Sequence, residues 1–192
     1  MPRLKEFDYD QKLETARNLF WEKGYNATSM HDLVDTLKLN RSSIYDTYGN
    51  KHTLFIKCLN SYILKKEGDY QAAAAKANSP LEAVQLIIKS VVKNMVLEEK
   101  TCMSVKTTFE LGQTDPETQA LLNNQAKNSV RLFSGLLQTA KDQGELAQDK
   151  DPEMIAHFIV ASFSSLWNAD ILFKDKKLTK KLLDHLIGTI AG

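Results

Sequence analysis

The stretch TSMHDLVDTLKLNRSSIYDTYGNKHTL, from Thr28 to Leu54, decides the fold of this chain. Apolar residues recur in its first part at three- and four-residue spacing, which predicts one buried helix face: Met30, Leu33, Val34 and Leu37. The hydroxyl of Thr28 or Ser29 can cap this helix by accepting a hydrogen bond from a free backbone N–H group. The first part is therefore expected to be a short helix.

A second short helix is expected from Arg41, after an interruption at Leu39-Asn40, and it ends at Gly49-Asn50. Only Ile44 and Tyr48 are spaced to face inward. The other side chains are Ser, Thr, Tyr, Asp and Arg, which have little to bury and much to offer a partner. This arrangement is typical of a helix-turn-helix, whose second helix enters the major groove of DNA.

Four short motifs around this stretch carry a resemblance to a known family: Gly24–Met30 (GYNATSM), Ser42–Tyr45 (SSIY), Tyr48–Lys51 (YGNK) and Leu54-Phe55. Together they resemble the N-terminal signature of the TetR family over roughly residues 8 to 60. The resemblance implies an all-helical, dimeric, ligand-responsive transcriptional regulator. Many relatives have His-Phe where this chain has Thr47-Tyr48, so the contact made at position 47 stays open.

The whole chain is expected to be all-α, with about nine helices. Its 192 residues include only four Pro and eight Gly, and no alternating strand pattern dominates. Beyond the helix-turn-helix, caps, prolines and apolar spacing predict helices over 8–23, 50–77, 80–97, 102–112, 116–143, 152–172 and 177–190. We expect a three-helix DNA-binding domain over 1–50 and a ligand-binding and dimerisation domain over 51–192.

The composition is that of an ordinary globular protein, with 43% apolar and 26% charged residues. No apolar run approaches the roughly 18 residues of a membrane span, and the start lacks a signal peptide, so we expect a cytoplasmic protein without a membrane partner. Cys58 and Cys102 are too few for a disulfide framework. The four histidines are scattered, so neither a metal site nor a cofactor is expected: His31, His52, His157 and His185.

Positive charge is unevenly distributed along the chain. Residues 1–35 hold five Lys or Arg against seven acidic residues, whereas residues 36–66 hold six against Asp46 alone. The excess lies at and after the second helix of the motif, where DNA phosphates would lie. Lys57, Lys65 and Lys66 could equally form a solvated face of the next helix.

Residues expected to contact DNA lie on or beside the second helix of the motif: Thr28, Asn40, Arg41, Ser42, Ser43, Tyr45, Thr47, Tyr48, Lys51 and His52. Arg41 suits a guanine or a phosphate, and Asp46 could accept from a cytosine amino group. For Tyr45 the resemblance to the family implies a contact with the sugar-phosphate backbone. Thr28, Lys51 and His52 start helices, where a phosphate is favoured. The alternative for Thr28 and Lys51 is plain helix capping.

The resemblance also implies a two-fold dimer and a sensor pocket. The last two helices would form the dimer contact through Phe158, Ser162, Leu166, Leu182 and Leu186, unless these belong to the core of one chain. An apolar pocket among the middle helices would be lined by Met95, Met103, Phe109, Phe133, Phe163 and Trp167, each of which could instead be ordinary core. Possible polar contacts in that pocket are Asn94, Asn168 and His157.

Cys102 is a candidate redox or electrophile sensor. The segment Thr101–Lys106 resembles a Cys-containing helix start in a subgroup of the family, some of whose members sense through this thiol. Lys100 and Lys106 would favour its thiolate at a helix N-terminus. The alternative is a small buried apolar residue, and Thr101 stands where that subgroup usually has Gly.

The leading hypothesis is thus a DNA-binding repressor that binds a palindromic operator as a dimer and is released by a small ligand or by thiol modification. An enzyme is disfavoured, because the sequence has no Gly-rich phosphate loop, HExxH or GxSxG motif. The alternative is a helical ligand- or partner-binding protein with a non-functional helix-turn-helix.

Overall fold

The computed structural model describes the backbone of residues 7–98 and 101–191, and the side chains of residues 7–91 and 101–190. Within these ranges the chain folds into nine α-helices and contains no β-strand, as the sequence predicted. The helices are α1 (Tyr9–Lys23), α2 (Met30–Leu37), α3 (Arg41–Tyr48), α4 (Lys51–Ala74), α5 (Pro80–Glu98), α6 (Met103–Leu111), α7 (Pro116–Asp142), α8 (Pro152–Phe173) and α9 (Lys176–Ala191).

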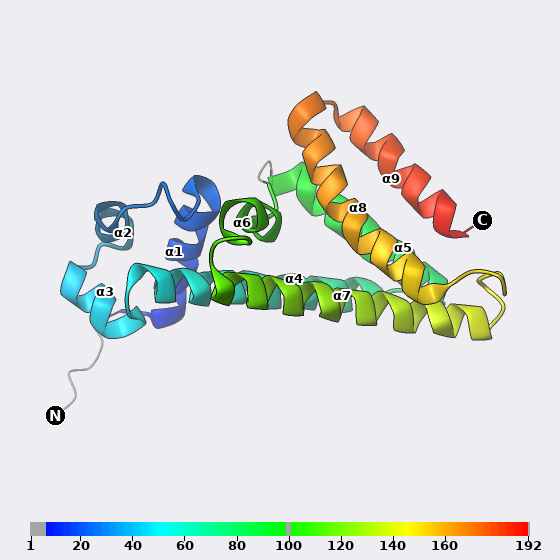
Figure 1. Cartoon of the computed structure of the whole chain (residues 1–192), viewed down its shortest axis with the longest axis horizontal. Helices are drawn as coiled ribbons and strands as arrows, with labels where there is room; N and C mark the ends of the chain where they lie inside the picture. The colour runs from blue at the N-terminus through cyan, green and yellow to red at the C-terminus, as the bar shows by residue number, and fades with distance from the viewer. Residues whose placement is uncertain (1–6, 99–100, 192) are drawn as a thin grey trace.

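Helices α1, α2 and α3 gather at one end of the molecule around the first half of α4 (Figure 1). Their core is built from the apolar residues that the helical spacing had predicted, including Leu33, Leu37 and Ile44, each fully buried. Met103 and Leu111 of α6 belong to the same cluster. The small helix-turn-helix unit is therefore closed by a helix that comes much later in the chain.

The long helices α4 and α7 lie side by side along the length of the molecule (Figure 1). With 24 and 27 residues they measure about 36 and 40 Å at 1.5 Å per residue. Helix α4 ends at Ala74, three residues before its predicted end, because the chain tightens there: the N–H groups of Lys76 and Ala77 donate to carbonyls only three residues back.

A second apolar core fills the other end of the molecule, where α5, α7, α8 and α9 pack together with the end of α4. Val84, Ile87 and Ile88 of α5 are fully buried in it, as are Phe133 and Leu137 of α7. Helix α4 contributes side chains to both cores. Any displacement of α4 along its axis therefore moves the helix-turn-helix relative to this body.

Candidate nucleic-acid interface and sensor pocket

The starts of α2 and α3 are fixed by local hydrogen bonds. The Ser29 hydroxyl accepts from the Asp32 N–H at 3.1 Å, and the Asp32 carboxylate accepts from the Ser29 N–H at 2.8 Å, so the two residues cap α2 reciprocally. Lys38 ends α2 in the left-handed conformation (φ 54°). Asn40 then caps α3 by accepting from the Ser43 N–H at 2.8 Å. These bonds set the angle at which α3 is presented.

Helix α3 buries one narrow face and exposes the rest. Ile44 and Tyr48 point inward, whereas the exposed residues form a continuous polar surface: Arg41, Ser42, Tyr45 and Asp46. Ser43 and Thr47 are half-buried at its edge. The Arg41 guanidinium lies 5.6 Å from the centre of the Tyr45 ring and donates to its hydroxyl at 3.4 Å. The exposed side chains contact one another and leave their outer side to solvent.

Two of the residues expected to touch DNA are interior groups instead. Thr28 is fully buried, and its hydroxyl donates to the Gly24 carbonyl at 2.6 Å. The Tyr48 ring is 1% exposed, lies 4.8 Å from the Tyr9 ring, and donates its hydroxyl to the Tyr9 carbonyl at 2.8 Å. Burial raises the pKa of this hydroxyl to about 12. Side-chain contacts to DNA from Thr28 and Tyr48 are therefore ruled out as long as this fold is kept.

Lys51 and His52, at the start of α4, also have internal partners. The Lys51 ammonium lies 4.3 Å from the centre of the Tyr25 ring, and loss of solvent lowers the pKa of this lysine. The His52 Nε2 atom lies 2.7 Å from Asp115 Oδ2, at the N-terminus of α7. The His52 ring thus links α4 to α7 and stays 31% exposed, and its phosphate contact remains a prediction.

Asp115 is the acceptor at the centre of this link, since it also accepts from the Thr118 hydroxyl. Burial acts to raise the pKa of Asp115, but the hydrogen bonds from Thr118 and His52 outweigh it and hold that pKa below its usual value. The ionised carboxylate is the form that this junction stabilises.

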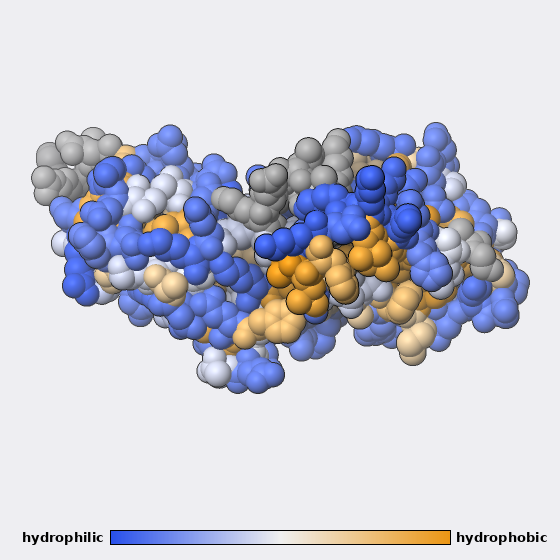
Figure 2. Space-filling view, turned by 90° about the horizontal axis from the view of Figure 1, so that it is seen from above, coloured by the Kyte–Doolittle hydropathy of each residue, from blue (hydrophilic) through white to orange (hydrophobic). Residues whose placement is uncertain are grey.

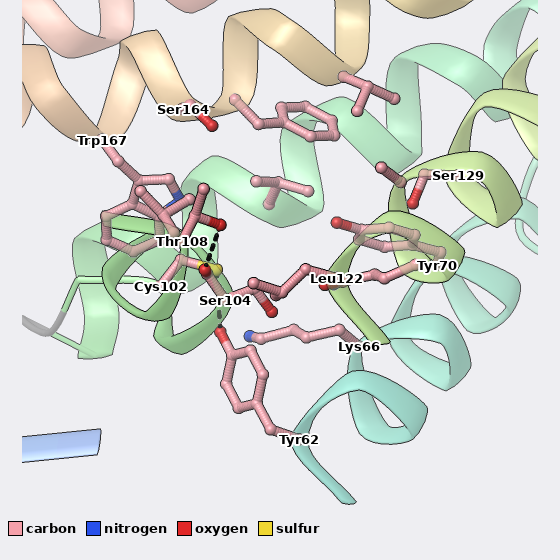
Figure 3. Close-up of a pocket in the computed structure, with 16 residues that line it drawn as sticks. Tyr62, Lys66, Tyr70, Cys102, Ser104, Thr108, Leu122, Ser129, Ser164 and Trp167 are labelled. Carbon is pink, nitrogen blue, oxygen red and sulfur yellow. Dashed lines mark hydrogen bonds between the residues drawn. The ribbon is translucent and has the colours of Figure 1, made fainter. Parts of the chain in front are cut away.

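A pocket of about 150 Å³ opens between the helix-turn-helix end and the C-terminal body, enclosed by α4, α5, α6, α7 and α8 (Figure 3). Its apolar wall comes mainly from α8, through Val160, Phe163 and Trp167. Polar groups lie opposite, from α4, α6 and α7: Tyr62, Lys66, Tyr70, Cys102, Ser104, Thr108, Gln125 and Ser129. The size and the mixed lining suit a small molecule with one apolar and one polar end.

Of the described residues expected to line this pocket, Phe163 and Trp167 do so. Met103 and Phe133 are buried in the two cores, and Phe109 is 78% exposed outside it. Asn168 lies with Phe109 at a different surface hollow, and His157 is exposed. Met95 and Asn94 lie outside the described side chains.

Sequence reasoning missed the side of the pocket formed by α4. Tyr62, Lys66 and Tyr70 recur every four residues and so share one face of that helix. The sequence did offer a signal for this side: the series Tyr62, Lys66 and Tyr70 lies on a helix face that is otherwise apolar. Side chains of this kind bury their apolar stems and keep their polar tips in an open space, as in a pocket.

Cys102 lies in this pocket at the residue before α6 and is partly exposed. Its sulfur accepts a hydrogen bond from the Tyr62 hydroxyl at 3.3 Å. The ammonium of Lys106, which was expected beside this thiol, donates to the carbonyls of Trp21 and Glu22. Lys100 lies outside the described residues. Among the described residues, the Tyr62 hydroxyl is thus the hydrogen-bond partner of this thiol.

Helix α6 joins the pocket to the helix-turn-helix. The Lys106 ammonium caps the end of α1 by donating to Glu22 O at 2.7 Å. The Glu110 carboxylate accepts from the N–H groups of Asn26 at 2.7 Å and Tyr25 at 3.1 Å, in the loop that leads to α2. The Trp21 indole donates to the Thr101 carbonyl at 2.5 Å. Three side chains therefore tie the start, middle and end of the α6 segment to α1 and its loop.

The outer faces of α8 and α9 form a groove of about 290 Å³ that is lined by all five residues expected at a dimer contact. Phe158 is 52% and Leu182 37% exposed, while Ser162 is half-buried. Leu166 and Leu186 are each 5% exposed and pack mainly within the chain's own core. They form the floor of the groove, and Phe158 and Leu182 form its exposed rim.

Further apolar side chains gather over α6 and the C-terminal end of α8, beneath a band of hydrophilic residues (Figure 2). Phe109, Ile171, Leu172 and Phe173 are each at least half exposed there. By length and composition only, α8 is long and apolar enough to cross a membrane. Its buried side, however, packs on α5, α7 and α9 as a core helix does.

Among the described residues, no three His, Cys, Asp or Glu side chains converge on a metal position.

The chain has a helix-turn-helix whose second helix faces outward, and this unit is attached to a helical body with its own pocket. This architecture is that of a DNA-binding regulator of the helix-turn-helix class. Comparison with known proteins makes the class specific. Residues 13–58 match the family model described as "Bacterial regulatory proteins, tetR family", and residues 80–186 match the "Tetracyclin repressor-like, C-terminal domain". The chain belongs to the tetR family.

Individual relatives agree with this assignment. An uncharacterised HTH-type transcriptional regulator of Bacillus subtilis, YezE, is 35% identical over 169 residues, which are 86% of this chain and 87% of the relative. The HTH-type transcriptional repressor ComR of Escherichia coli is 25% identical over 82% of this chain and 76% of its own length. The solved structure of a cysteine mutant of the TetR family regulator CifR, in complex with operator DNA, has the same fold (TM-score 0.82, 23% identity, 96% and 97% coverage).

Proposed function

We propose that this protein is a transcriptional repressor that binds a palindromic operator as a dimer, with α3 of each subunit in the major groove. The observation that carries the proposal is the polar outer surface of α3, which is held by caps at Ser29 and Asn40 and covered by no described part of the chain. A fixed helix with free side chains is what base readout requires.

Each exposed residue of α3 has a role that suits its chemistry. Arg41 lies at the N-terminal end and can reach a guanine edge or a phosphate, while Tyr45 beside it suits the sugar-phosphate backbone. Ser42, Ser43, Thr47 and Asn40 can donate to a phosphate oxygen, and they can donate to or accept from a base edge. Lys51 lies beyond α3 with its ammonium over the Tyr25 ring, and it can donate to a phosphate from there. Thr28 and Tyr48 are buried and position these groups, whereas the half-buried His52 can still reach a phosphate.

The dimer is proposed to form through the α8–α9 groove, where a second copy would cover Phe158, Ser162 and Leu182 over the floor made by Leu166 and Leu186. A two-fold pair presents two α3 helices, and thus reads two half-sites of a palindrome. This contact also accounts for the apolar outer face of α8. We assign residues 1–50 to DNA binding and residues 51–192 to effector binding and dimerisation.

Release from the operator is proposed to start in the pocket that holds Phe163 and Trp167, by a small effector or by modification of Cys102. Either event would act on α6, whose Lys106 and Glu110 hold α1 and its loop. An effector shifts the dimer only if it binds the released state more tightly. In this proposal the protein works in the cytoplasm and has no enzymatic activity of its own.

Operator binding is tested by gel shift on the DNA flanking the protein's own gene. Arg41→Ala should weaken specific binding by about tenfold to a hundredfold, whereas Arg131→Ala, an exposed arginine on α7, should leave it unchanged. Tyr45→Ala should weaken binding to specific and unrelated DNA alike. No specific shift at low salt, or equal behaviour of both arginine variants, would favour a ligand- or partner-binding protein with a non-functional helix-turn-helix.

The thiol branch is tested with the two cysteines of the chain. Cys102 lines the pocket, whereas Cys58 is fully buried on α4 and burial raises the pKa of its thiol. An aromatic disulfide reagent should modify Cys102 at least about tenfold faster than Cys58 and release the operator. Cys102→Ser should abolish the release and Cys58→Ser should not. If the reagent still releases the operator from Cys102→Ser, the thiol mechanism is refuted, and a small effector remains as the proposed trigger.

A further inference from the structure

An apolar surface outside the α8–α9 groove stays exposed in the single chain. It lies over α6 and the C-terminal end of α8, where Figure 2 shows hydrophobic residues gathered on one face of the molecule. Four large side chains, each at least half exposed, make up this α6–α8 patch: Phe109, Ile171, Leu172 and Phe173. Apolar side chains gathered in this way on a surface mark an interaction site.

A hollow of about 590 Å³ opens beside this patch, where α1, α6 and α8 meet. Its apolar lining comes from all three helices: Trp21, Val105, Phe109 and Ile171. One acidic and one basic residue, Glu22 and Lys106, also line it, so the hollow has no charge bias toward an anionic or a cationic partner. The Lys106 ammonium is already bonded to the carbonyls of Trp21 and Glu22. The hollow therefore suits apolar side chains of another molecule.

The patch continues the outer face of α8. Residues at three- and four-residue spacing share one side of a helix, and one such seam runs along the whole of α8: Met154, Phe158, Ser162, Ser165, Ala169 and Leu172. None of these six side chains is buried. Phe158, Ser162 and Ser165 line the α8–α9 groove, and Leu172 belongs to the patch. The α8 seam thus joins the groove to the patch without a break.

The groove alone is too small to hold two copies of the chain together. Eight described residues line it, whereas a specific interface takes about 20–30 residues on each side. Eight described residues also line the hollow, and the exposed seam residues between the two sites add to them. Groove, seam and hollow together come close to the size that a stable dimer requires. A partner that covers the groove and is large enough to reach the hollow is a second copy of this chain.

We propose that the dimer contact extends beyond the α8–α9 groove, so that the partner subunit covers Leu172 and closes the hollow over Phe109 of α6. This inference rests on the proposed function only in taking the groove as the place where two copies meet. In a two-fold contact the same patch is buried on both subunits. The partner therefore touches α6 as well as α8 and α9.

This contact makes α6 the meeting point of three regions. Val105 lines both the effector pocket and the hollow, and Glu110 holds the loop before α2. Phe109, one residue earlier, faces the partner. An effector that shifts α6 thus changes the contact between subunits together with the hold on the helix-turn-helix. Effector affinity and dimer affinity are linked, and each changes the other by the same factor.

Sedimentation velocity of the full chain over a dilution series measures the dimer. Phe109→Glu and Leu172→Glu should each raise the dissociation constant at least about tenfold, because each buries an unpaired charge on both sides of the contact. Leu64→Glu, which changes a similarly exposed leucine on α4 outside the patch and the seam, should leave it unchanged. The photo-crosslinker p-benzoylphenylalanine in place of Phe109 should join two chains covalently, and in place of Leu64 it should not.

Phe158→Glu, in the groove, separates this inference from the proposed function. If it dissociates the dimer while Phe109→Glu and Leu172→Glu do not, the contact ends at the groove, and the inference is overturned with the repressor intact. A crosslink from position 109 in a chain that binds no operator would sustain the contact and refute the repressor.

Two further results would overturn the extended contact. One is a chain that stays monomeric at about 100 µM, which would also refute the dimer itself. The other is binding to phosphatidylglycerol vesicles that Leu172→Glu abolishes while the dimer is unchanged, which would assign the patch to a membrane surface. Circular dichroism of each variant shows that it is folded, and the crosslink needs no destabilising charge.

Discussion

Helices α3 and α6 are similar in length, with eight and nine residues, and opposite in how the chain uses them. Helix α3 is capped at its start by Asn40, and its exposed side chains bond only to one another. Helix α6 makes no side-chain cap of its own, and its Lys106 and Glu110 bond to backbone atoms of α1 and the following loop. One helix is built to present a surface, and the other is built to connect two regions.

The contrast shows where a signal can pass. A helix that reads DNA must keep one orientation, and local caps provide it without help from distant residues. A helix that transmits binding must change its contacts between two states. Helix α6 touches the pocket through Ser104 and the loop before α2 through Glu110, so it is the element that contacts both regions.

The largest expected effect separates the two faces of α3. Tyr48→Ala removes a ring that is 1% exposed, and should lower the free energy of unfolding by about 3–4 kcal/mol. Tyr45→Ala removes a ring that is 39% exposed and should cost less than about 0.5 kcal/mol. Urea unfolding at a fixed protein concentration measures both. Similar losses in the two variants would mean that α3 does not have one buried and one free face.

The second prediction concerns α6. Glu110→Gln keeps one acceptor for the loop after α1 but loses the charged bonds to Tyr25 and Asn26, so stability should fall by about 1–2 kcal/mol. Hydrogen exchange should quicken at the amides of these two residues. Glu22→Gln, at an exposed position nearby, is the matched control and should change neither quantity. Unchanged exchange at Tyr25 and Asn26 would show that α6 does not hold this loop.

The apolar periodicity, the helix caps and the prolines in the sequence predicted the helices well, because all three are local features. The prolines and caps at Pro80, Pro116 and Pro152 mark helix starts directly, and the apolar spacing of Leu33, Leu37 and Ile44 shows which faces are buried. The exposed residues of α3 followed from the same reasoning, since only Ile44 and Tyr48 could face inward.

The pocket was predicted less well because burial alone does not say which space a side chain borders. Phe133 and Met103 were correctly expected inside, but they fill cores, while Phe109 lies outside. Lys66 was treated as a possible surface charge, and only the packing of α4 against α6 and α7 places it in a cavity. The partners of Thr28 and His52 were likewise missed: the Thr28 hydroxyl donates to Gly24 within the same loop, and the His52 ring meets Asp115 of a distant helix start.

The third prediction tests the junction between α4 and α7. The pKa of Asp115 is lower in the folded chain than the usual value of about 3.9, so its charge stabilises the fold above that pH and the contribution is lost as pH falls through the folded pKa. Asp115→Asn should therefore cost about 1 kcal/mol at pH 7, and the difference from wild type should shrink below about pH 4. Urea midpoints across this range measure it. Asp149→Asn, at an exposed position, should show no comparable loss, and a gap that widens in acid would contradict the assignment.

The smallest effect concerns α4, the helix that joins the two regions. Gly68 lies in its interior with no atom within 4 Å of an added methyl group, so Gly68→Ala should stabilise the fold by about 0.5–1 kcal/mol. Gly144 has equal space but a φ of +77°, where alanine is strained, so Gly144→Ala should destabilise by about 1 kcal/mol. If stiffening α4 at Gly68 also changes the operator affinity, the long helix takes part in switching. If only stability changes, α6 alone carries the connection between pocket and reading helix.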